Sequence, residues 1–520
     1  MKKRFAFLLF FAISATAFTN LVFETKYYVS PTGSTSAIGT ISDPLNFTTA
    51  IAKSLTAGDS LIIRGGLYSF SGSQTISKSG SATLFYHIIA FPGEIPILDF
   101  RTQVYGSSSI GVKLSSNFVH FKGITVQGAG DNGLQVTGSN NFIENCTFRW
   151  NCDSGIQMKT GSNNYIFNCD SYENFDYQTG GTSAPDYGGN ADGFADKQYT
   201  NTGTNTYKGC RSWKNSDDGW DSYEKIGNTV YDSCFCYANG PSTFDMTGNI
   251  RFKTDSATWF SKFKNAAGRY VITNYGNGNG FKLGGNYTAN NATLHNCISV
   301  GNTVKGFDQN NNNGIMTIYN CTGYINKPDY GFSNSSYGTL IIKNCASLSS
   351  KSSNSLNCKS VTQSFNSWNS GFSCVTADFV SLDYAQMLNQ RQSDGSLPEI
   401  TFLHLTPTSG LLNKGTNVGF AYVGSAPDLG AFEYGVMTPV ENIPIENEDI
   451  EIYCNADKNL TVNGKLANIE IYSLSGIKLY SQNCSSENTT IPVLNLSKNI
   501  YFVRVILKNG TSLTRKLLIY

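Results

Sequence analysis

Two short acidic motifs stand out among the residues that could do chemistry. The runs NADGF and NSDDGWD supply four carboxyl groups, those of Asp192, Asp217, Asp218 and Asp221. Asp before Gly is an ordinary turn former, which accounts for Asp192 and Asp218, but not for Asp217 or for Asp221 in a strand-like stretch. If the two motifs lie side by side, these carboxylates repel one another unless a cation lies between them. Oxygen ligands without His or Cys favour Ca²⁺ over Zn²⁺ or copper.

A third motif, GNGFKLGG, supplies Lys282. When the motifs are aligned on their glycines, Lys282 falls in the same position as Asp221 before it and Asp308 after it. These residues can be a plain ladder of alternating charge on a solvated face. Alternatively, Lys282 lies beside a cation, whose charge favours the neutral amine. Such a lysine can accept a proton near neutral or mildly alkaline pH.

The elements that position these motifs follow a repeat. Seven cysteines, each after a small polar residue, are separated by 23, 41, 24, 63, 24 and 24 residues. Glycine before a large apolar residue recurs in step with them, and two insertions of 15 and 37 residues interrupt the same segment of the repeat. A self-similar period of this size is typical of solenoids. The cysteines are Cys146, Cys169, Cys210, Cys234, Cys297, Cys321 and Cys345, and the large residues are Leu134, Ile156, Phe194, Trp220, Phe281, Phe307 and Phe332.

We predict from this period a parallel β-helix, in which each repeat is one coil and equivalent residues stack about 4.8 Å apart. The repeats contain short alternating stretches with Asn and Gly turns and lack the regular leucines of a leucine-rich repeat. The cysteines then form one inward ladder and the large residues a second one. The aromatic residues could instead stack on sugars, but their fixed position beside glycine favours core packing. Both insertions fall at one corner, where we expect them to wall a cleft.

The N-terminal residues have separate patterns. Residues 1–17 combine a basic start, a short apolar run and an A-x-A site, which predicts a secretory signal peptide. The apolar run is too short for the roughly 30 Å of a bilayer core, so we expect no membrane span. Residues 27–30 are expected to form a strand. Ser42-Asp43-Pro44 predicts the start of a helix through Leu55 that caps the open end of the solenoid.

The period fades after Cys345, and the chain is irregular to residue 435. Residues 436–449 have the composition of a linker. Residues 450–520 hold alternating stretches broken by Asn-Gly and Ser-Gly pairs, which predicts a small antiparallel β-sandwich. The predicted domains are therefore a β-helix over 18–435 and a sandwich over 450–520.

The composition agrees with an all-β protein. Of 520 residues only 14% are charged, while 51 are Gly, 33 Phe and 29 Tyr, which argues against a disordered chain, a coiled coil or a helical bundle. With a net charge of +1, no overall field attracts nucleic acid or an anionic membrane surface. We expect a monomer that binds charged partners through a local cluster.

Two resemblances extend these predictions. The segments 471–476 and 500–505, with Lys516 near the end, resemble the C-terminal sorting domain of type IX secretion in Bacteroidota. That resemblance implies the secretion machinery as a partner and a location outside the cell or on its surface. The ordered set NADGF, NSDDGWD and GNGFKLGG is similar to polysaccharide lyase family 9, the pectate lyase type built on a right-handed parallel β-helix, over roughly residues 26–435.

The lyase resemblance implies a role for each motif. Carried over residue by residue, the Ca²⁺ ligands fall on Asp192, Asp217, Asp218 and Asp221, and the catalytic base falls on Lys282. A uronate carboxylate bound to Ca²⁺ is partly neutralised, which acidifies the C5 hydrogen beside it. The lysine removes that hydrogen, the C4 oxygen departs, and a 4,5-unsaturated sugar remains. The implied substrate is a polyanionic pectic polysaccharide such as polygalacturonate.

Two other functions compete with lysis. β-Helix polygalacturonases also carry acidic motifs, and paired carboxylates suit inverting hydrolysis. Such hydrolases are expected to add a Gly-His-Gly and an Arg-x-Lys, whereas His87, His120, His295 and His404 lie in no Gly-His-Gly. A non-catalytic surface β-helix that binds glycans and structural calcium is opposed only by the coincidence of Lys282.

Several assignments stay open from the sequence. Asp196 stands where a small neutral residue is expected, and the insertion over 241–277 leaves the choice between homogalacturonan and rhamnogalacturonan undecided. Four basic residues near the motifs could grip distal carboxylates but are each expected to be solvated surface charges. They are Lys197, Lys214, Arg211 and Lys305. Disulfides between Cys358 and Cys374 or between Cys454 and Cys484 are neither predicted nor excluded.

Overall fold

The structure of the protein is a computed structural model. It describes residues 25–435 except 177–179, 182–183, 186, 201 and 252–263, and residues 451–519 except 455–458, 465, 474–477, 487, 494–498 and 509–511. The predicted signal peptide at 1–17 and the predicted linker at 436–449 lie outside the described residues. Among the residues described, no helix is both long enough and apolar enough to cross a membrane.

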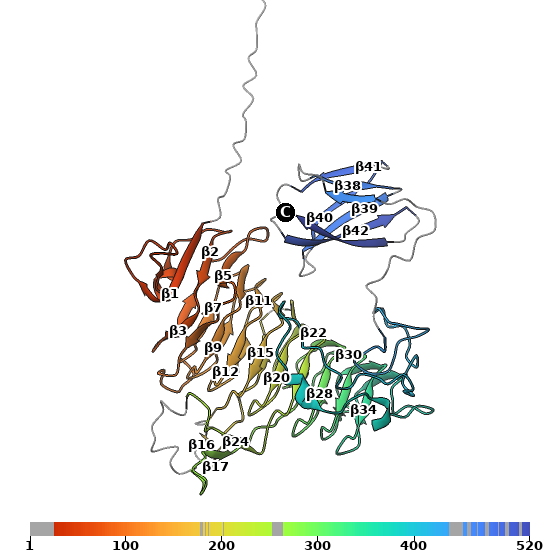
Figure 1. The fold of residues 1–520 in the computed structure, drawn as a ribbon. Coiled ribbons are helices and arrows are strands. Elements are labelled where there is room, and N and C mark those ends of the chain that lie inside the picture. The colour runs from red at the N-terminus through yellow and green to blue at the C-terminus, as the bar shows by residue number, and fades with distance from the viewer. Residues whose placement is uncertain are drawn as a thin grey trace, which may run out of the picture.

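The first part of the chain winds into the predicted right-handed parallel β-helix, with three long sheets named here A, B and C (Figure 1). Sheet A contains, in spatial order, β1 (Lys26–Ser34), β2 (Ser60–Ile63), β5 (Tyr86–Ala90), β8 (Val119–Lys122), β11 (Phe142–Glu144), β14 (Tyr165–Phe167), β19 (Thr204–Lys208), β22 (Gly227–Asp232), β27 (Asn290–His295), β30 (Ile315–Tyr319), β33 (Thr339–Lys343) and β36 (Ser360–Ser364).

Sheets B and C complete each coil. Sheet B contains β3 (Gly66–Ser69), β6 (Pro96–Asp99), β9 (Thr125–Gln127), β12 (Thr147–Arg149), β15 (Asp170–Tyr172), β20 (Arg211–Trp213), β23 (Phe235–Tyr237), β28 (Ile298–Val300), β31 (Thr322–Tyr324) and β34 (Ala346–Leu348). Sheet C contains β4 (Gln74–Ile76), β7 (Val112–Leu114), β10 (Leu134–Val136), β13 (Ile156–Met158), β18 (Phe194–Asp196), β21 (Trp220–Asp221), β26 (Phe281–Lys282), β29 (Phe307–Asp308), β32 (Tyr330–Phe332) and β35 (Ser355–Leu356).

Antiparallel sheets form in the insertions and near the C-terminus. Within the insertions, β16 (Gly180–Gly181) pairs with β17 (Ala184–Pro185), and β24 (Thr243–Asp245) pairs with β25 (Val271–Thr273). The C-terminal residues form two sheets, which confirms the predicted antiparallel structure there. One sheet has β37 (Glu451–Cys454), β38 (Asn459–Asn463) and β41 (Asn488–Pro492); the other has β40 (Lys478–Asn483), β39 (Leu466–Ser473), β42 (Asn499–Leu507) and β43 (Ser512–Ile519).

The cysteine ladder marks the bend between sheets A and B. The small polar residue before each cysteine has φ between +50° and +61°, as Asn145 and Asn344 do, which turns the chain sharply. Asn, Ser and Gly tolerate this left-handed conformation better than bulkier residues. All seven cysteines then point inward and are at most 1% exposed. The ladder is confirmed, and these thiols, like those of Cys358, Cys374 and Cys484, are free.

The second inward ladder is also confirmed, with one correction. Phe194, Trp220 and Phe281 stack with ring centroids 4.9 and 4.6 Å apart and interplanar angles of 8° and 6°. The coil after that of Phe307 contributes Tyr330 and not Phe332, because Phe307 pairs with Tyr330 in the strand register. Phe332, two residues on, is buried but pairs with a residue of β35.

A third ladder lies at the corner between sheets B and C and was not predicted. Asparagine follows each of the first six cysteines by five residues, and the side-chain amides donate from coil to coil at 2.8 to 3.0 Å. These residues are buried: Asn151, Asn174, Asn215, Asn239, Asn302 and Asn326. The glycines of the repeat lie against this ladder; a Cβ on Gly133 would lie 2.6 Å from Asn151 Nδ2. Glycine is therefore required by close packing.

The capping helix is shorter than predicted. Helix α1 (Phe47–Ala52) begins after Asn46, whose side chain accepts a hydrogen bond from the Thr49 N–H at 2.8 Å. Asp43 is therefore not the N-cap, because the residues after it pair with β1 before the helix can start: Leu45 bridges to Val29 and Ser34. Phe47, Ala50 and Ile51 of this helix pack into the solenoid core.

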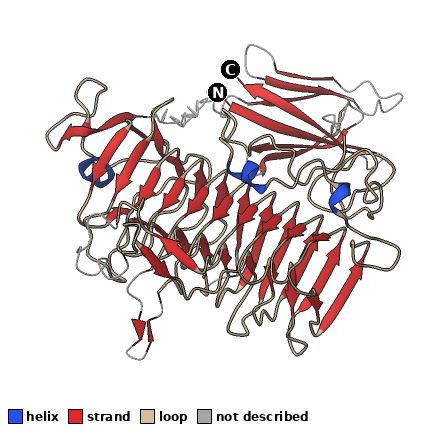
Figure 2. Cartoon of the chain, turned by 60° about the horizontal axis from the view of Figure 1, so that its bottom comes forward, coloured by secondary structure: helices blue, strands red, loops and turns tan. Residues whose placement is uncertain are grey.

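The solenoid continues one coil beyond the last repeat marked by cysteine. Strand β36 pairs with β33, and Asn366 takes the position that follows Cys345 in the ladder. The irregular chain then packs on the outer face of sheet B, with 3₁₀ helices at Thr376–Asp378 and Tyr384–Leu388 (Figure 2).

Gly133→Ala is expected to destabilise the protein by about 1 to 3 kcal/mol, because the new methyl group would overlap Asn151 Nδ2 and the Gly155 carbonyl oxygen. The measurement is the free energy of unfolding from guanidinium titration. Gly72→Ala, where a Cβ meets nothing within 4 Å, is the control. Equal stability of both variants would contradict the role of the corner glycines.

Candidate active site

The strand register brings the predicted residues together on the outer face of sheet C. Asp221 pairs with Ala195 on one side and with Lys282 on the other, and Lys282 pairs with Asp308. These residues alternate with the inward aromatic ladder, so their side chains point out of the core. The predicted column of Asp221, Lys282 and Asp308 is confirmed.

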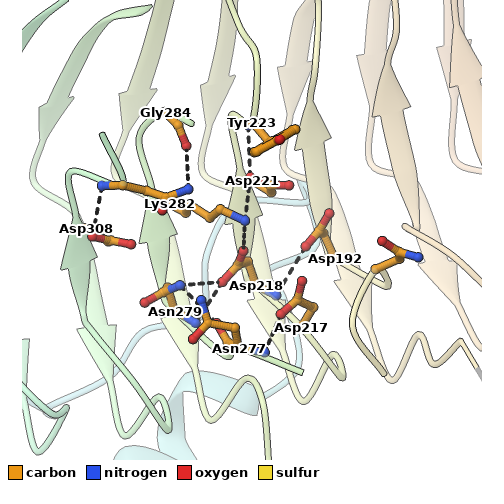
Figure 3. Close-up of polar contacts among 12 residues, drawn as sticks. Asp192, Asp217, Asp218, Asp221, Tyr223, Asn277, Asn279, Lys282, Gly284 and Asp308 are labelled. Atoms are coloured by element: carbon orange, nitrogen blue, oxygen red, sulfur yellow. Dashed lines mark hydrogen bonds and ion pairs between the residues drawn. The ribbon is translucent and has the colours of Figure 1, made fainter. Parts of the chain in front are cut away.

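Three carboxylates converge beside this column (Figure 3). Asp192, Asp218 and Asp221 each offer an oxygen atom that lies within 4.8 Å of the others, and all three side chains are buried. Asp192 and Asp218 come from the residue before the glycine of successive coils. The backbone N–H of Asp218 donates to Asp192 Oδ1 at 3.2 Å, so the backbone itself holds these two carboxylates close.

Asp217 lies next to this group but outside it. Its Oδ1 accepts the backbone N–H of Asn277, which belongs to the second insertion. Asn279, which precedes the glycine of the next coil, donates both its N–H and its side-chain Nδ2 to Asp218 Oδ1 at 2.8 Å. The second insertion therefore contacts the acidic cluster directly.

Two lysines compensate the carboxylates. Lys282 Nζ lies 2.9 Å from Asp218 Oδ2 and 3.2 Å from Asp221 Oδ1, and 5.7 Å from the centre of the Tyr223 ring. Lys197 Nζ lies 3.1 Å from Asp192 Oδ2 and 2.8 Å from Asp221 Oδ2. Figure 3 shows Lys282 reaching across toward Asp218 and Asp221.

Lys197 is the site residue that sequence reasoning missed. It was expected to be a solvated surface charge, yet only 23% of its side chain is exposed. Arg211 is likewise not a surface charge, because it is buried, pairs with Asp170 at 2.7 Å and donates to the Met387 carbonyl oxygen. Lys305 pairs with Asp308 at 2.8 Å, and of the four only Lys214 is exposed as expected.

Burial and mutual repulsion raise the pKa values of most of the carboxyl groups. The pKa of Asp192 rises to about 8 and that of Asp218 to about 6, since burial outweighs the nearby ammonium groups. Burial, Asp218 and Asp192 raise the pKa of Asp217 well above its usual value. Burial also acts to raise the pKa of Asp221, but Lys197 and Lys282 outweigh it and lower that pKa.

The carboxylates hold Lys282 in its protonated form. Burial acts to lower the pKa of Lys282, but Asp218, Asp221 and the other two carboxylates outweigh it and raise the pKa well above 10.5. The lowered pKa expected from the sequence therefore does not arise from these side chains by themselves. It requires a second positive charge that competes with the lysine for the carboxylates.

The donor set fits a hard divalent cation. When all are ionised, the three converging carboxylates, Asp217 beside them and the two ammonium groups carry a formal charge of −2. Asp218 Oδ2 is buried and accepts no hydrogen bond within the described part of the chain, and the Lys282 ammonium lies 2.9 Å from it. Oxygen ligands of this kind suit Ca²⁺, which takes six to eight of them.

Asp196 does not belong to this cluster. It pairs in register with Met158, whose side chain points into the core, and is 1% exposed. Its carboxylate accepts from Asn205 Nδ2 at 3.1 Å and lies 3.5 Å from Lys225 Nζ, which is fully buried. The open question about Asp196 is thus answered by a charge pair inside the solenoid.

Both insertions leave the solenoid at the same corner, as predicted, and they contact each other. The Tyr275 N–H donates to the Tyr187 carbonyl oxygen at 2.8 Å. The second insertion also reaches back along the solenoid, where Arg251 donates to the carbonyl oxygens of Arg101 at 3.0 Å and Gly128 at 3.3 Å. The described parts of both insertions therefore lie at the corner that carries Asp217, whose Oδ1 accepts the backbone N–H of Asn277.

Several known proteins are similar to this chain in fold and in sequence. Residues 27–354 match the family described as Pel9A-like, right handed beta helix region, and residues 447–520 match the secretion system C-terminal sorting domain. Pectate lyase L of Dickeya chrysanthemi is 36% identical over 421 residues, which cover 78% of this chain and 90% of that protein. The crystal structure of pectate lyase Pel9A has a TM-score of 0.67 at 33% identity and covers 79% of this chain and 96% of its own. A rhamnogalacturonan lyase, at 23% identity and a TM-score of 0.62, covers 74% of this chain and 97% of its own and shares the fold.

The fold and the site thus define a β-helical polysaccharide lyase. The chain belongs to the Pel9A-like family, polysaccharide lyase family 9 of the pectate lyase type, and it carries a C-terminal sorting domain of type IX secretion. Membership of a lyase family argues against both the inverting hydrolase and the non-catalytic binding protein.

Without divalent cations, the protein is expected to lose stability as the pH rises from about 5 to about 9. The folded pKa values of Asp192, about 8, and Asp218, about 6, lie above the unfolded value, so the folded state binds more protons in this range. The free energy of unfolding then falls with rising pH. Guanidinium titrations in chelator at several pH values measure it.

Asp192→Asn is the matched variant for this measurement. Of Asp192 and Asp218 it removes the group with the higher pKa, and it should flatten the pH dependence between pH 6 and 9. A wild-type stability that rises through this interval would show that the carboxylates are not held protonated.

Proposed function

We propose that the protein is a calcium-dependent lyase that cleaves a pectic uronate polymer by β-elimination, with Lys282 as the general base. This proposal rests on the close approach of one lysine to three converging carboxylates, because Lys282 Nζ lies within 3.2 Å of two of them. The pectate lyase names of the relatives support the substrate class.

Ca²⁺ would be held by Asp192, Asp218 and Asp221, with Asp217 beside them. When bound there, it supplies positive charge that attracts a uronate carboxylate and stabilises the negative charge developing beside it. Lys197 bridges Asp192 and Asp221, so it keeps these two side chains in place. A near-neutral protein needs such a cation, because the acidic cluster alone repels a polyanion.

Lys282 changes its role when the carboxylate charge is neutralised. Asp218 and Asp221 then no longer hold its proton, and the amine becomes able to accept one. Lys282 Nζ takes the C5 hydrogen of the sugar as a proton, and the electron pair left behind forms the C4–C5 double bond. The bond from C4 to the glycosidic oxygen breaks, and that oxygen leaves with its electron pair.

The location and domain boundaries belong to the same proposal. Residues 1–17 would direct export as a signal peptide and be removed, and residues 450–520 would direct passage through the type IX machinery after the 436–449 linker. The β-helix of residues 18–435 would then act as a monomer outside the cell or on its surface. There it would meet a polymer that is too large to enter the cell.

Purified protein on polygalacturonate is expected to produce rising ultraviolet absorbance in calcium, because β-elimination leaves a conjugated unsaturated sugar. Chelator should abolish the increase, and calcium should restore it. The same assay on rhamnogalacturonan tests which of the two pectic backbones the protein cleaves. New reducing ends without absorbance would overturn the elimination mechanism.

Lys282→Ala is expected to lower kcat by about 10² to 10⁴, the usual contribution of a general base. Lys282→Arg should be nearly as inactive, because a guanidinium keeps the positive charge but does not release its proton. Lys113→Ala is the control, since Lys113 lies in the same outward column of sheet C, five strands away.

Calcium affinity, measured by calorimetry, provides a second readout for these variants. Loss of the competing ammonium in Lys282→Ala should leave affinity equal or higher. If Lys282→Ala keeps full activity, the assignment of the base is wrong.

A further inference from the structure

The corner between sheets B and C changes its charge along the solenoid. Before the active site, two coils carry Asp131 and Asp153 there, each two positions before the corner glycine. After the active site, three successive coils carry a lysine at the same corner, namely Lys305, Lys327 and Lys351. The acidic cluster and Lys282 lie between these two stretches.

Backbone hydrogen bonds place the lysines one coil apart. The Lys327 N–H donates to the carbonyl oxygen of Val304 at 2.7 Å, and the Lys351 N–H donates to that of Asn326 at 2.8 Å. The adjoining strands β29, β32 and β35 are direct neighbours in sheet C. At the usual spacing of about 4.8 Å per strand, the lysines extend roughly 14 Å from the coil of Lys282.

Lys305 connects this row to the floor of the site. Its ammonium lies 2.8 Å from Asp308, the neighbour of Lys282 in the outward column. Its aliphatic stem crosses the next position of the column, where Gly331 leaves room; a Cβ there would lie 2.4 Å from Lys305 Cδ.

Lys327 and Lys351 are available for a ligand. Both are exposed, and within the described part of the chain neither forms an ion pair. The nearby carboxylate of Asp329 is buried and accepts hydrogen bonds from Asn326 and Ser347 at 2.9 and 2.7 Å. The corner therefore presents uncompensated positive charge at regular intervals beside the site.

We propose that Lys305, Lys327 and Lys351 form an anion-binding rim that holds successive carboxylates of the substrate on the C-terminal side of Lys282. On the other side the same corner carries the buried Asp131 and the half-buried Asp153 in place of lysines, so the polymer is gripped asymmetrically. A single exposed charge contributes little, but a polyuronate meets all three at once. This inference rests on the proposed function, because it takes the polyuronate as its ligand.

The test variant is Lys327→Ala/Lys351→Ala. The control is Lys343→Ala/Lys414→Ala, which removes equal charge from β33 of sheet A and from the irregular chain that follows the solenoid. Binding is measured on full-length protein by affinity electrophoresis through polygalacturonate, in a Lys282→Ala background so that the polymer stays intact. The rim variant should bind about fivefold more weakly, the effect of two modest charge contacts, while the control binds as the parent does.

Kinetics on the proteins with Lys282 intact gives the second measurement. The rim variant should raise KM for polygalacturonate about as much as it weakens binding, with the change in KM and not in kcat, and its KM should depend less on salt. Unchanged binding and KM in the rim variant, or an equal loss in the control, would overturn the rim. A wild-type protein that is retarded by polygalacturonate but forms no unsaturated product would refute the proposed function and leave the rim standing.

Discussion

Stacked asparagine amides at the corner between sheets B and C hold the coils in one register. Each amide donates to the next side-chain oxygen, and the backbone N–H groups of the same residues are satisfied by the same oxygens, as in Asn151 and Asn174. A shift of one residue would leave buried amides without partners, at a cost of about 1 to 3 kcal/mol each. The glycines that follow, the inward aromatic ladder and the outward column of Asp221 and Lys282 all take their positions from this corner.

The same corner is where the chain tolerates its two long insertions. Because the amide ladder lies before the point of departure and the glycine after it, the insertions change neither the core nor the strand register. They lie beside a site in which backbone N–H groups hold the carboxylates of Asp192 and Asp217. Two charge arrangements can neutralise the carboxylates of the site. In one, the two lysine ammonium groups and bound protons do so. In the other, a divalent cation takes the place of some of these positive charges.

Much of this could be read from the sequence. The periodic Cys and Gly residues predicted the coil. Alignment of the glycines predicted the column of Asp221, Lys282 and Asp308, because residues one repeat apart in a solenoid become neighbours in space. The asparagine ladder was equally periodic, five residues after each cysteine, and could have been found by the same alignment. Phe332 was misplaced because the sequence alignment followed Gly331, whereas the strand register pairs Phe307 with Tyr330.

Other features depend on long-range packing that no local pattern encodes. The start of α1 at Phe47 follows from pairing of Leu45 with β1. The burial of Arg211 depends on a segment about 180 residues later in the chain. Lys197 joins the acidic cluster only because its side chain turns back toward Asp192 and Asp221, and sequence spacing does not fix that direction. The assignment of metal ligands and base therefore continues to rest on resemblance and geometry together.

The free thiols in the core have a consequence for biogenesis. Seven cysteines stack on adjacent coils, and they are sealed from solvent only after those coils have assembled. An exported chain meets oxidants outside the cytosol, and an unfolded chain would offer those thiols for wrong pairing at every stage of its passage. Rapid winding of the solenoid therefore protects these thiols, because each coil that assembles buries its cysteine before an oxidant can reach it.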